Sequence, residues 1–522
     1  MSDDPESLTP AGLSAPVEIE LKLATDADGL AALSDAPELD GGSLVRRLDS
    51  TYFDTRDRRL TARGITLRVR KIGRRYVQTI KTAGKGSAGG LSTRSEWEWP
   101  IDGPKPDLSA IDDHSVIGLI GLVRPQELQA VFGTRVRRTI RTLDFRGARI
   151  EVALDDGEVV AGRRRQPLHE VELELLAGDV DPLYELALAL NRRHTLSIDP
   201  RSKAARGEAL ANGSAPQPKF QSSIDLPGDV TVDDGLALIL GNCLTHWTEN
   251  LPAVREGSDP EGIHQARVAL RRLRSALQLF RPVIGAAEIE PLKHRLRALG
   301  NAMGPARDAD VFIDEMLGPV ATAMPQETSL AALKQAAEAW RQDGYEQART
   351  ALDGPEATEM ALSMGHWIAL RGWRQQPYSP TVEWLDRPMV DLADQLLQRR
   401  LRAVLKRGRG FANLPADARH EVRIAMKKLR YAVDFCAPLY PSPATKLFFK
   451  HLKRLQSLLG HLQDQAMTEA ALSHLGADGA DAKLQRAVGL VAGWHAHAMV
   501  DLSTRTNAEW AAFKNAKPFW HV

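Results

Sequence analysis

Like charges two residues apart recur along the first 210 residues of this chain of 522 residues. In a β-strand such residues point to the same face, so each set presents its charges together. Carboxylates at this spacing repel one another unless cations lie between them, and arginines repel one another unless anions do. The carboxylate sets are Glu18 with Glu20 and Glu170 with Glu172 and Glu174, and the guanidinium set is Arg68 with Arg70.

The mixture of signs suggests a particular chemistry. Arginine and lysine bind phosphate oxygens, and carboxylate oxygens are the ligands that Mg²⁺ and Mn²⁺ prefer. A cavity lined by both would hold a polyanion and a divalent metal, which suits phosphoryl transfer. A second metal could acidify or position a water molecule. The solvated face of an ordinary sheet explains any one strand equally well, but the set of strands favours a lined cavity.

The elements that must position these residues are short alternating segments, which predict an antiparallel barrel or sandwich of about eight strands. The segments are 17–23, 44–53, 64–71, 75–81, 93–99, 134–143, 148–154 and 168–176. Asp155-Asp156-Gly157 is typical of a turn after the seventh segment. Helices are predicted at about 181–193, where Asp181-Pro182 is a start signal, and at about 116–130.

From about residue 229 to the end, apolar residues recur at spacings of three and four, which predicts helices. This half contains an internal repeat at an offset of 156 residues, in which the segment from His264 to Arg274 matches the segment from His420 to Arg430. The repeat predicts two copies of one helical unit, packed as two bundles. Residues 211–228 are typical of a linker.

The repeated segment carries a basic face. On a helix, His264, Arg267, Arg271 and Arg274 lie within roughly 80° of arc, at about 100° per residue. A solvated or salt-bridged face explains one copy, but its repetition favours an anion-binding surface. A third stripe without a counterpart in the first copy is formed by Arg399, Arg402, Lys406 and Arg409. These faces are poor in aromatic residues, which argues against binding of single-stranded nucleic acid.

The overall composition limits the remaining classes. A formal net charge of +1 provides no global field for nucleic acid or an anionic membrane. Cys243 and Cys436 do not have metal-ligand spacing and cannot form a disulfide framework. There is no run of about 18 apolar residues, and the N-terminus does not resemble a signal peptide. We expect a cytoplasmic protein without membrane contacts.

The charged segments, taken in order, resemble the CYTH, or triphosphate tunnel metalloenzyme, superfamily over residues 16–210. Glu18-Ile19-Glu20-Leu21-Lys22 is similar to the ExExK signature of the family. The further matching segments are Tyr52–Thr55, Leu67–Arg70, Thr79–Thr82, Arg94–Glu98, Ala153–Asp155, Glu170–Glu174 and Ser202–Lys203. The resemblance implies an eight-stranded antiparallel barrel that forms a tunnel and acts on triphosphates with a divalent metal.

The resemblance also implies roles for individual residues. The implied metal ligands are Glu18, Glu20, Glu170, Glu172 and Asp155, and the implied catalytic residues are Glu170, Glu172 and Lys22. The implied phosphate-binding residues are Lys22, Arg68, Arg70, Lys81, Arg94, Arg138 and Lys203. Arg138 lies on the strand face opposite Arg135, Arg137 and Arg141, so which face lines the tunnel depends on whether a β-bulge intervenes.

The helical half resembles the CHAD domain over about 230–515. This resemblance implies two pseudo-symmetric four-helix bundles with a basic groove associated with inorganic polyphosphate. The candidate polyphosphate-binding residues are His264, Arg267, Arg271, Arg274, Arg297, His420, Arg423, Lys427, Arg430 and Lys453. The expected domains are the tunnel domain at 15–210 and the helical domain at 229–520, with repeats at about 229–375 and 376–520.

Together these features predict metal-dependent hydrolysis of inorganic triphosphate to pyrophosphate and phosphate, with Mg²⁺ or Mn²⁺ as cofactor and polyphosphate bound by the helical half. Several alternatives remain open. Thiamine triphosphate, a nucleoside triphosphate or the cyclisation of ATP would use the same phosphate-binding motifs. A non-catalytic polyphosphate-binding scaffold is the rival in a different class, although anion binding alone does not require the carboxylates.

Overall fold

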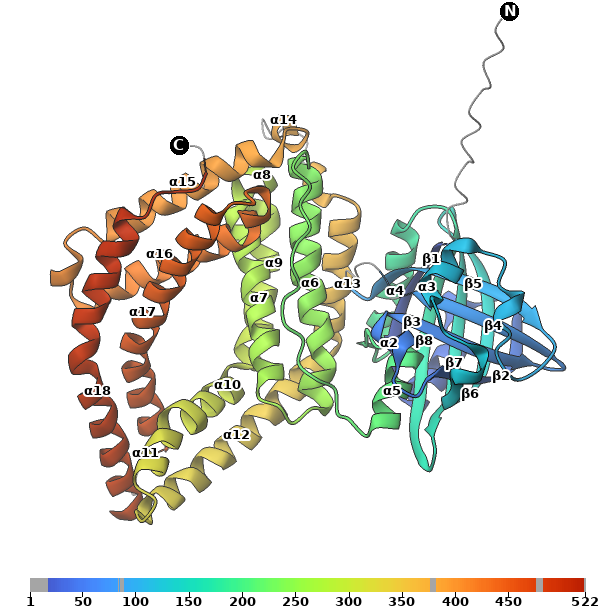
Figure 1. Ribbon diagram of the computed structural model, residues 1–522, viewed down its shortest axis with the longest axis horizontal. Helices are drawn as coiled ribbons and strands as arrows, with labels where there is room; N and C mark the ends of the chain where they lie inside the picture. Colours follow the sequence, from blue (N-terminus) through green and yellow to red (C-terminus); the bar gives the residue numbers. More distant parts are fainter. Residues whose placement is uncertain (1–16, 83, 85–88, 376–381, 476–481, 521–522) are drawn as a thin grey trace, which may run out of the picture. The chain divides into compact units, whose positions relative to one another are not determined.

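The computed structural model describes residues 17–82, 84, 89–375, 382–475 and 482–520. The chain divides into two compact units, Met1–Ser214 and Ala215–Val522, which are drawn in Figure 1. Among the described residues, none of the helices combines the length and the apolar composition needed to cross a membrane.

The first unit is an eight-stranded antiparallel barrel. Neighbouring strands follow the order β5-β4-β3-β2-β6-β7-β8-β1, and a further pairing of β1 with β5 closes the ring. The strands are β1 (Val17–Ala24), β2 (Ser43–Thr55), β3 (Ile65–Ile72), β4 (Arg75–Thr82), β5 (Leu91–Ile101), β6 (Leu128–Phe145), β7 (Ala148–Ala161) and β8 (Arg164–Ala177). The short strand β9 (Ser197–Ile198) pairs with the end of β1. The predicted barrel is therefore confirmed.

Helices pack against the strands of the barrel. The helices of this unit are α1 (Ala27–Ser34), α2 (Arg59–Ala62), α3 (His114–Ile120), α4 (Asp181–Arg193) and α5 (Lys203–Asn212). Helix α4 contacts β1, β7 and β8, and Leu21 and Leu23 on β1 are fully buried. The alternation of β1 thus separates an apolar outer face, packed beneath helices, from a charged inner face.

Two local predictions were wrong. The helix predicted at 116–130 ends at Ile120, and β6 already begins at Leu128. The turn predicted at Asp155-Asp156-Gly157 lies inside β7, which continues to Ala161. Asp155 faces inward and is paired with Arg138, so a residue typical of turns is used within the strand. A Cβ atom on Gly157 would lie 2.1 Å from the carbonyl oxygen of Arg135, so only glycine fits this close approach.

The second unit is helical. Its principal helices are α6 (Val232–Glu256), α7 (Glu261–Leu279), α9 (Ala286–Ala302), α10 (Gly304–Val311), α12 (Ser329–Asp353), α13 (Pro355–Ala369), α15 (Met389–Arg407), α16 (Ala416–Cys436), α17 (Pro443–Leu475) and α18 (Ala482–Asn515). The short helices are α8 (Arg281–Ile284), α11 (Gly318–Ala323) and α14 (Val382–Leu385), and a π-helical turn occupies Phe312–Leu317. The repeat is visible because α6 and α7 pack together as α15 and α16 do.

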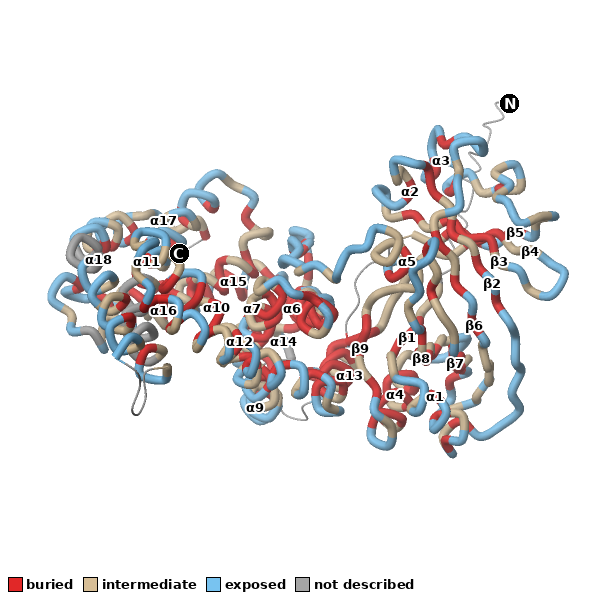
Figure 2. The backbone as a smooth tube through the Cα atoms, turned by 90° about the horizontal axis from the view of Figure 1, so that it is seen from below, coloured by how far each residue is buried: buried red, intermediate tan, exposed pale blue. Residues whose placement is uncertain are grey.

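Burial is unequal within this unit. Figure 2 shows that buried residues concentrate on α6 and α7, whereas α18 carries mainly exposed and half-buried residues. A hydrophobic cluster joins the π-helical turn to α12, α17 and α18, and its buried members include Phe312, Leu333 and Val491. Helices α7 and α16, which carry the repeated basic faces, also pack against each other.

The residues that precede α6 lie along that helix. The backbone N–H of Lys219 donates to the side chain of Asn250 at 2.9 Å, and the Asn250 amide donates back to the Lys219 carbonyl at 2.9 Å. Ser222 is bound by Asn242 on α6, and Ile224 and Leu226 are buried. This segment is therefore held by side-chain contacts within the helical unit.

Candidate functional site

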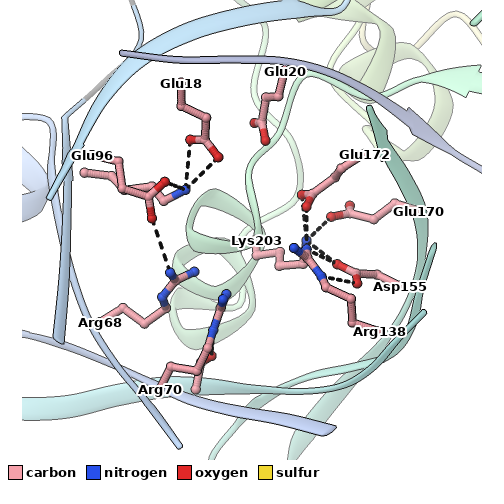
Figure 3. Close-up of polar contacts among 12 residues, drawn as sticks. Glu18, Glu20, Arg68, Arg70, Glu96, Arg138, Asp155, Glu170, Glu172 and Lys203 are labelled. Carbon is pink, nitrogen blue, oxygen red and sulfur yellow. Dashed lines mark hydrogen bonds and ion pairs between the residues drawn. The ribbon is translucent and has the colours of Figure 1, made fainter. Parts of the chain in front are cut away.

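Charged side chains from seven strands point into the barrel (Figure 3). The register places them opposite one another across neighbouring strands. Glu18 pairs with Arg94, Lys81 with Glu96, and Arg138 with Asp155, in each case as directly opposed residues. Opposed side chains in an antiparallel pair lie about 5 Å apart at Cβ, which is within reach of an ion pair. The sequence alternation and this register together produce a lumen lined by both signs of charge.

The β1 cluster is one of two groups of ion pairs in this lumen. Its members are Glu18, Glu20, Arg68, Lys81, Arg94, Glu96 and Glu98. The Lys81 ammonium lies 3.0 Å from Glu18 Oε2 and 2.6 Å from Glu96 Oε2. Arg94 binds both Glu18 and Glu20, and Arg68 lies 3.5 Å from Glu96. Each of these cations is therefore held by at least one carboxylate.

The Lys203 cluster is the second group and consists of Asp155, Glu170, Glu172, Lys203 and Arg138. The Lys203 ammonium lies 2.7 Å from Asp155 Oδ2 and 2.8 Å from Glu172 Oε1, and it also contacts Glu170. Arg138 binds Asp155 through two nitrogens, at 2.7 and 2.6 Å, and contacts Glu172. Asp155 and Glu170 are completely buried.

The surroundings shift the acidities of these carboxyl groups in opposite directions. Burial would raise the pKa of Glu18, but Lys81 and Arg94 outweigh it and lower that pKa to about 2. Burial and then Glu172 raise the pKa of Glu20. Burial, Glu18 and Glu151 raise the pKa of Glu174 to about 7. The region around Glu20 and Glu174 therefore has more carboxylates than cations to compensate them.

Two predicted phosphate-binding residues lie outside these ion pairs. Arg70 donates to the hydroxyl of Ser50 at 3.2 Å, and within the described residues it forms no ion pair with a carboxylate. Burial, Arg68 and Arg138 lower the pKa of Arg70 to about 10. Lys22 is buried, and its ammonium donates to the backbone carbonyl of Arg201. Arg70 and Lys22 thus each donate one hydrogen bond to a neutral group among the described residues.

The donor set of the lumen fits a hard divalent cation. The candidate ligands are carboxylate oxygens, and the described residues around them contribute no cysteine or histidine to the lumen clusters. Mg²⁺ and Mn²⁺ prefer oxygen ligands of this kind. The excess of carboxylates around Glu20 and Glu174 would be compensated by a divalent cation held there.

The first repeat of the helical unit gathers its predicted cations on α7, α9 and α10. Arg274 lies near Arg297 and Arg271, and burial together with these two neighbours lowers its pKa. Burial and then Arg307 lower the pKa of His264 to about 4. Arg267 donates to the carbonyl of Gly300 at 2.7 Å and so caps the end of α9. Asp308 is a carboxylate close to Arg267, but Arg271 and Arg274 form no ion pair with a carboxylate within the described residues, so this part of the cluster remains positively charged.

The second repeat places its predicted residues on α16 and α17. His420, Arg423, Lys427 and Arg430 are half-buried on α16, and Lys453 is exposed on α17. The Lys453 ammonium lies 4.4 Å from the centre of the Phe449 ring. Arg271 of the first repeat donates to the hydroxyl of Tyr431 on α16 at 2.5 Å, which links the two basic helices directly.

Comparison with known proteins now identifies the two units. The CYTH domain family matches residues 17–207, and the CHAD domain family matches residues 238–473. The crystal structure of the CHAD domain from the plant Ricinus communis is 30% identical, with a TM-score of 0.50, and the match covers 58% of this chain and 99% of that chain.

The chain joins a CYTH domain to a CHAD domain.

Curated relatives match parts of this chain. A protein of Haemophilus influenzae named inorganic triphosphatase is 32% identical over 167 residues, which is 32% of this chain and 46% of that protein. A protein of Mycobacterium tuberculosis is 28% identical over 321 residues, which is 57% of each. The chain thus spans about half the length of these curated relatives.

The CYTH barrel brings together all the residues predicted for its tunnel. The structure also shows which face of β6 lines the tunnel, a point that the sequence left open. Arg138 points into the lumen, while Arg135 and Arg137 are exposed. The register runs through Arg137 and Arg138 without a shift, so no bulge is needed. Arg138 faces inward because it shares its strand face with Val136, which is buried in the barrel core.

Sequence reasoning missed two arginines of the CHAD domain. Arg307 lies close enough to His264 and Arg267 to lower both of their pKa values, and no sequence signal distinguishes it from other arginines. Arg272 is completely buried beside the basic face and lies 3.6 Å from Asp434 on α16. The helical spacing of Arg272, 100° from Arg271 toward the leucine side, was an available signal of its burial.

Proposed function

We propose that the CYTH domain hydrolyses inorganic triphosphate to pyrophosphate and phosphate with Mg²⁺ or Mn²⁺. The observation that carries this proposal is a closed barrel in which cations and carboxylates line the same lumen. The phosphate-binding side chains and the metal-binding carboxylates therefore face the same bound molecule. The similarity to a protein named inorganic triphosphatase supports the choice of substrate.

In this proposal the cations of the lumen bind phosphate and the carboxylates bind metal. Arg68, Arg70, Lys81 and Arg94 bind the phosphate oxygens, and Arg70 does so without leaving a carboxylate. Each of the other cations exchanges a carboxylate partner for a phosphate oxygen, which preserves a charge-assisted hydrogen bond. This exchange releases Glu18 and Glu20 from Lys81 and Arg94 and makes their oxygens available as metal ligands.

Glu18 and Glu20 would hold a divalent metal, which would supply electrostatic stabilisation of the charge that develops during phosphoryl transfer. Glu172 is placed to orient the attacking water and accept its proton, because its carboxylate reaches toward Glu20 from the neighbouring strand. Lys203 and Arg138 keep the pKa of Glu172 well below its usual range despite its burial. Glu172 is therefore ionised and can accept a proton.

We further propose that the CHAD domain binds inorganic polyphosphate through the basic faces of α7 and α16. Arg271 donates to a hydroxyl and lies close to Arg274, which in turn lies close to Arg297, and none of these three forms an ion pair with a carboxylate among the described residues, so their positive charge is not neutralised internally. A flexible polyanion compensates such a surface without a shaped pocket. Binding of this kind would increase the concentration of phosphate polymer near the chain.

The test is a comparison of substrates and variants. Phosphate, pyrophosphate and cyclic AMP are measured after incubation of the full chain with triphosphate, thiamine triphosphate or ATP, with and without Mg²⁺ or Mn²⁺. We expect metal-dependent release of pyrophosphate and phosphate from triphosphate, and roughly a 10²–10³-fold lower kcat in Glu20→Gln and in Glu172→Gln.

The matched control is Glu158→Gln. Glu158 lies on the same barrel but pairs with Arg135 and Arg165, which are exposed outside the lumen. Its activity should equal that of the wild type. Undiminished hydrolysis in the Glu20 and Glu172 variants would exclude the tunnel mechanism. Bound polyphosphate without hydrolysis of any of the three substrates would favour the scaffold instead.

A further inference from the structure

The Lys203 cluster contains three acidic side chains close enough to bind one metal ion. Among the described residues, Asp155, Glu170 and Glu172 are the group whose ligand oxygens lie within 4.8 Å of one another. The sequence predicted all three as metal ligands. The structure, however, shows the ammonium group of Lys203 in contact with all three carboxylates. The place that a metal ion would take is thus occupied by a side chain of the protein.

The oxygens of this group are nearly all engaged. Lys203 and Arg138 between them contact both oxygens of Asp155 and both oxygens of Glu172. Glu170 uses one oxygen to accept from Lys203, and its other oxygen is buried without a hydrogen-bond partner. A metal ion could enter only if it displaced the ammonium group.

The charges of the cluster are also balanced. Its three carboxylates face Lys203 and Arg138, and Lys22 adds a third cation that interacts electrostatically with Glu170. The β1 cluster differs, because its four carboxylates face three cations and Glu174 lies nearby as a further acid. Charge balance therefore favours a divalent ion at the β1 cluster and disfavours one at the Lys203 cluster.

The backbone holds Lys203 in position. Lys203 is the first residue of α5, and the hydroxyl of Ser202 caps that helix by accepting from the N–H of Ala205 at 3.1 Å. Just before it, Asp199 binds the side chains of Arg201 and Arg206, and Lys22 donates to the carbonyl of Arg201. The lysine is thus anchored through its backbone and through its ammonium group.

We propose that Lys203 is a resident cation of the tunnel, and that Asp155 and Glu170 position this lysine instead of binding metal. Glu172 contacts Lys203 and Arg138 through its two oxygens and also interacts electrostatically with Glu20 of the β1 cluster. The inference rests on the proposed metal dependence of the CYTH domain. It adds that Lys203 determines how many divalent ions the tunnel holds: one when the lysine is present, and a second when it is removed.

The test measures the stoichiometry of Mn²⁺ binding to the full chain in the absence of triphosphate, by electron paramagnetic resonance of the free ion. We expect one bound Mn²⁺ for the wild type, two for Lys203→Ala, and one for Lys203→Arg, which restores the cation. The double variant Lys203→Ala with Asp155→Asn should return to one. Two ions in the wild type, one of them lost in Asp155→Asn, would overturn the proposal, as would a single ion in Lys203→Ala.

Thermal unfolding provides a second measurement, because Lys203→Ala leaves buried carboxylates without their cation and should lower Tm. Added Mn²⁺ should raise Tm more in Lys203→Ala than in the wild type, and an equal rise in both would contradict the proposal. The outcomes also separate this proposal from the proposed activity. Stoichiometries of one and two without any hydrolysis would support the role of Lys203 and reject the triphosphatase. No Mn²⁺ bound to either protein would reject both.

Discussion

The CYTH tunnel and the CHAD basic faces both concentrate cations, but they compensate them in different ways. In the tunnel, Arg68 and Arg138 have side chains that are 8% and 14% exposed, and both are ion-paired with carboxylates. On the CHAD domain, Arg271 and Arg297 are exposed, and Arg271 contacts only a tyrosine hydroxyl among the hydrogen bonds found within the described chain. Carboxylates are interleaved with cations in the first region and scarce in the second.

Burial explains the difference. A charge removed from water requires a partner, whereas a charge at the surface is compensated by water and counterions. A ligand of the tunnel must therefore replace existing ion pairs, which makes its binding sensitive to shape and charge geometry. A ligand of the CHAD faces replaces counterions, so its affinity depends on its total charge and falls with salt.

Arg272 shows that the same rule holds within the CHAD domain. It is completely buried, and it lies 3.6 Å from Asp434, donates to Asn242 at 3.1 Å and stacks on Phe435 at 5.6 Å from the ring centre. The adjacent residue Arg271 is exposed and has no carboxylate partner within the described residues. Two consecutive residues of α7 therefore differ in this respect: Arg272 is buried and paired with a carboxylate, and Arg271 is exposed to solvent.

The largest expected effect tests whether the tunnel cations need their partners. Arg138→Met leaves Asp155 and Glu172 without one cation, and we expect a loss of about 3–5 kcal/mol of unfolding free energy because a buried charge is uncompensated. Equilibrium unfolding in urea measures it. The control is Arg137→Met, on the exposed face of the same strand, which should change the unfolding free energy by less than about 0.5 kcal/mol. Equal losses in the two variants would remove the distinction between the faces.

The second prediction concerns the basic faces of α7 and α16. Replacing four basic residues of α7 and α16 by glutamate should weaken polyphosphate binding by roughly 100-fold, or about 2.7 kcal/mol. The replaced residues are Arg271, Arg274, Lys427 and Arg430. The dependence of affinity on salt should also become shallower, because fewer counterions are released. Fluorescence anisotropy of labelled polyphosphate at several salt concentrations measures both changes, and triphosphate hydrolysis should be unaffected.

A matched control carries the same number of reversed charges on α15 and directly after its end at Arg407. Arg399, Arg402, Lys406 and Arg409 are all exposed and form the third basic stripe. Their replacement by glutamate should weaken polyphosphate binding much less than the replacement on α7 and α16 does, since only long-range attraction is lost. If both sets weaken binding equally, polyphosphate recognises the total charge of the CHAD domain and not the paired basic helices.

The third prediction uses pH to charge a site that the fold keeps neutral. Burial and then Arg272 lower the pKa of His246 from its ordinary value of 6.5 to about 4. The Nε2 atom faces the Lys219 carbonyl and the Gln265 side-chain oxygen, both at 3.1 Å, and Nδ1 faces Arg272, so the geometry suits a neutral ring protonated at Nε2. Because the folded pKa lies below the unfolded value, this stabilisation is complete above pH 6.5 and is lost as the pH falls toward 4.

The expected loss is on the order of 2 kcal/mol over that interval. Urea unfolding at pH 7, 5.5 and 4 measures it, and His246→Gln should show less dependence on pH because its amide does not titrate. His294→Gln, at an exposed position on α9, should keep the dependence of the wild type. A pH dependence that persists in His246→Gln would mean that another group is responsible.

The smallest expected effect concerns stability at the surface. Arg399→Gln and Arg402→Gln should each change the unfolding free energy by less than about 0.5 kcal/mol, because both residues are exposed and the described chain shows no ion pair for either. Urea unfolding of these two variants and of Arg138→Met under the same conditions compares their unfolding free energies directly. A loss above 1 kcal/mol would show that α15 uses these charges structurally.

The sequence by itself determined the strands, the repeat and the charged inner face of β1. Alternation with period two is a local property, so Glu18, Glu20 and Lys22 were assigned to one face without knowledge of their neighbours. The same reasoning placed Arg138 opposite Arg137 and left open which of the two faces the lumen. It ended β7 too early because Asp155 and Gly157 have the composition of a turn.

Only the tertiary structure decided which charges meet. Asp155, Glu170 and Lys203 come from β7, β8 and the start of α5; the register of β7 with β8 places the two carboxylates opposite each other, and the position of α5 brings Lys203 to both. The family pattern names these residues but does not say whether the carboxylates hold a metal ion or a lysine. In the CHAD domain, likewise, the helical period predicts the basic face, but the packing of α7 against α16 buries Arg272 and leaves Arg271 exposed. Periodicity is set by neighbours along the chain, whereas compensation of a charge depends on groups that are distant in sequence and close in space.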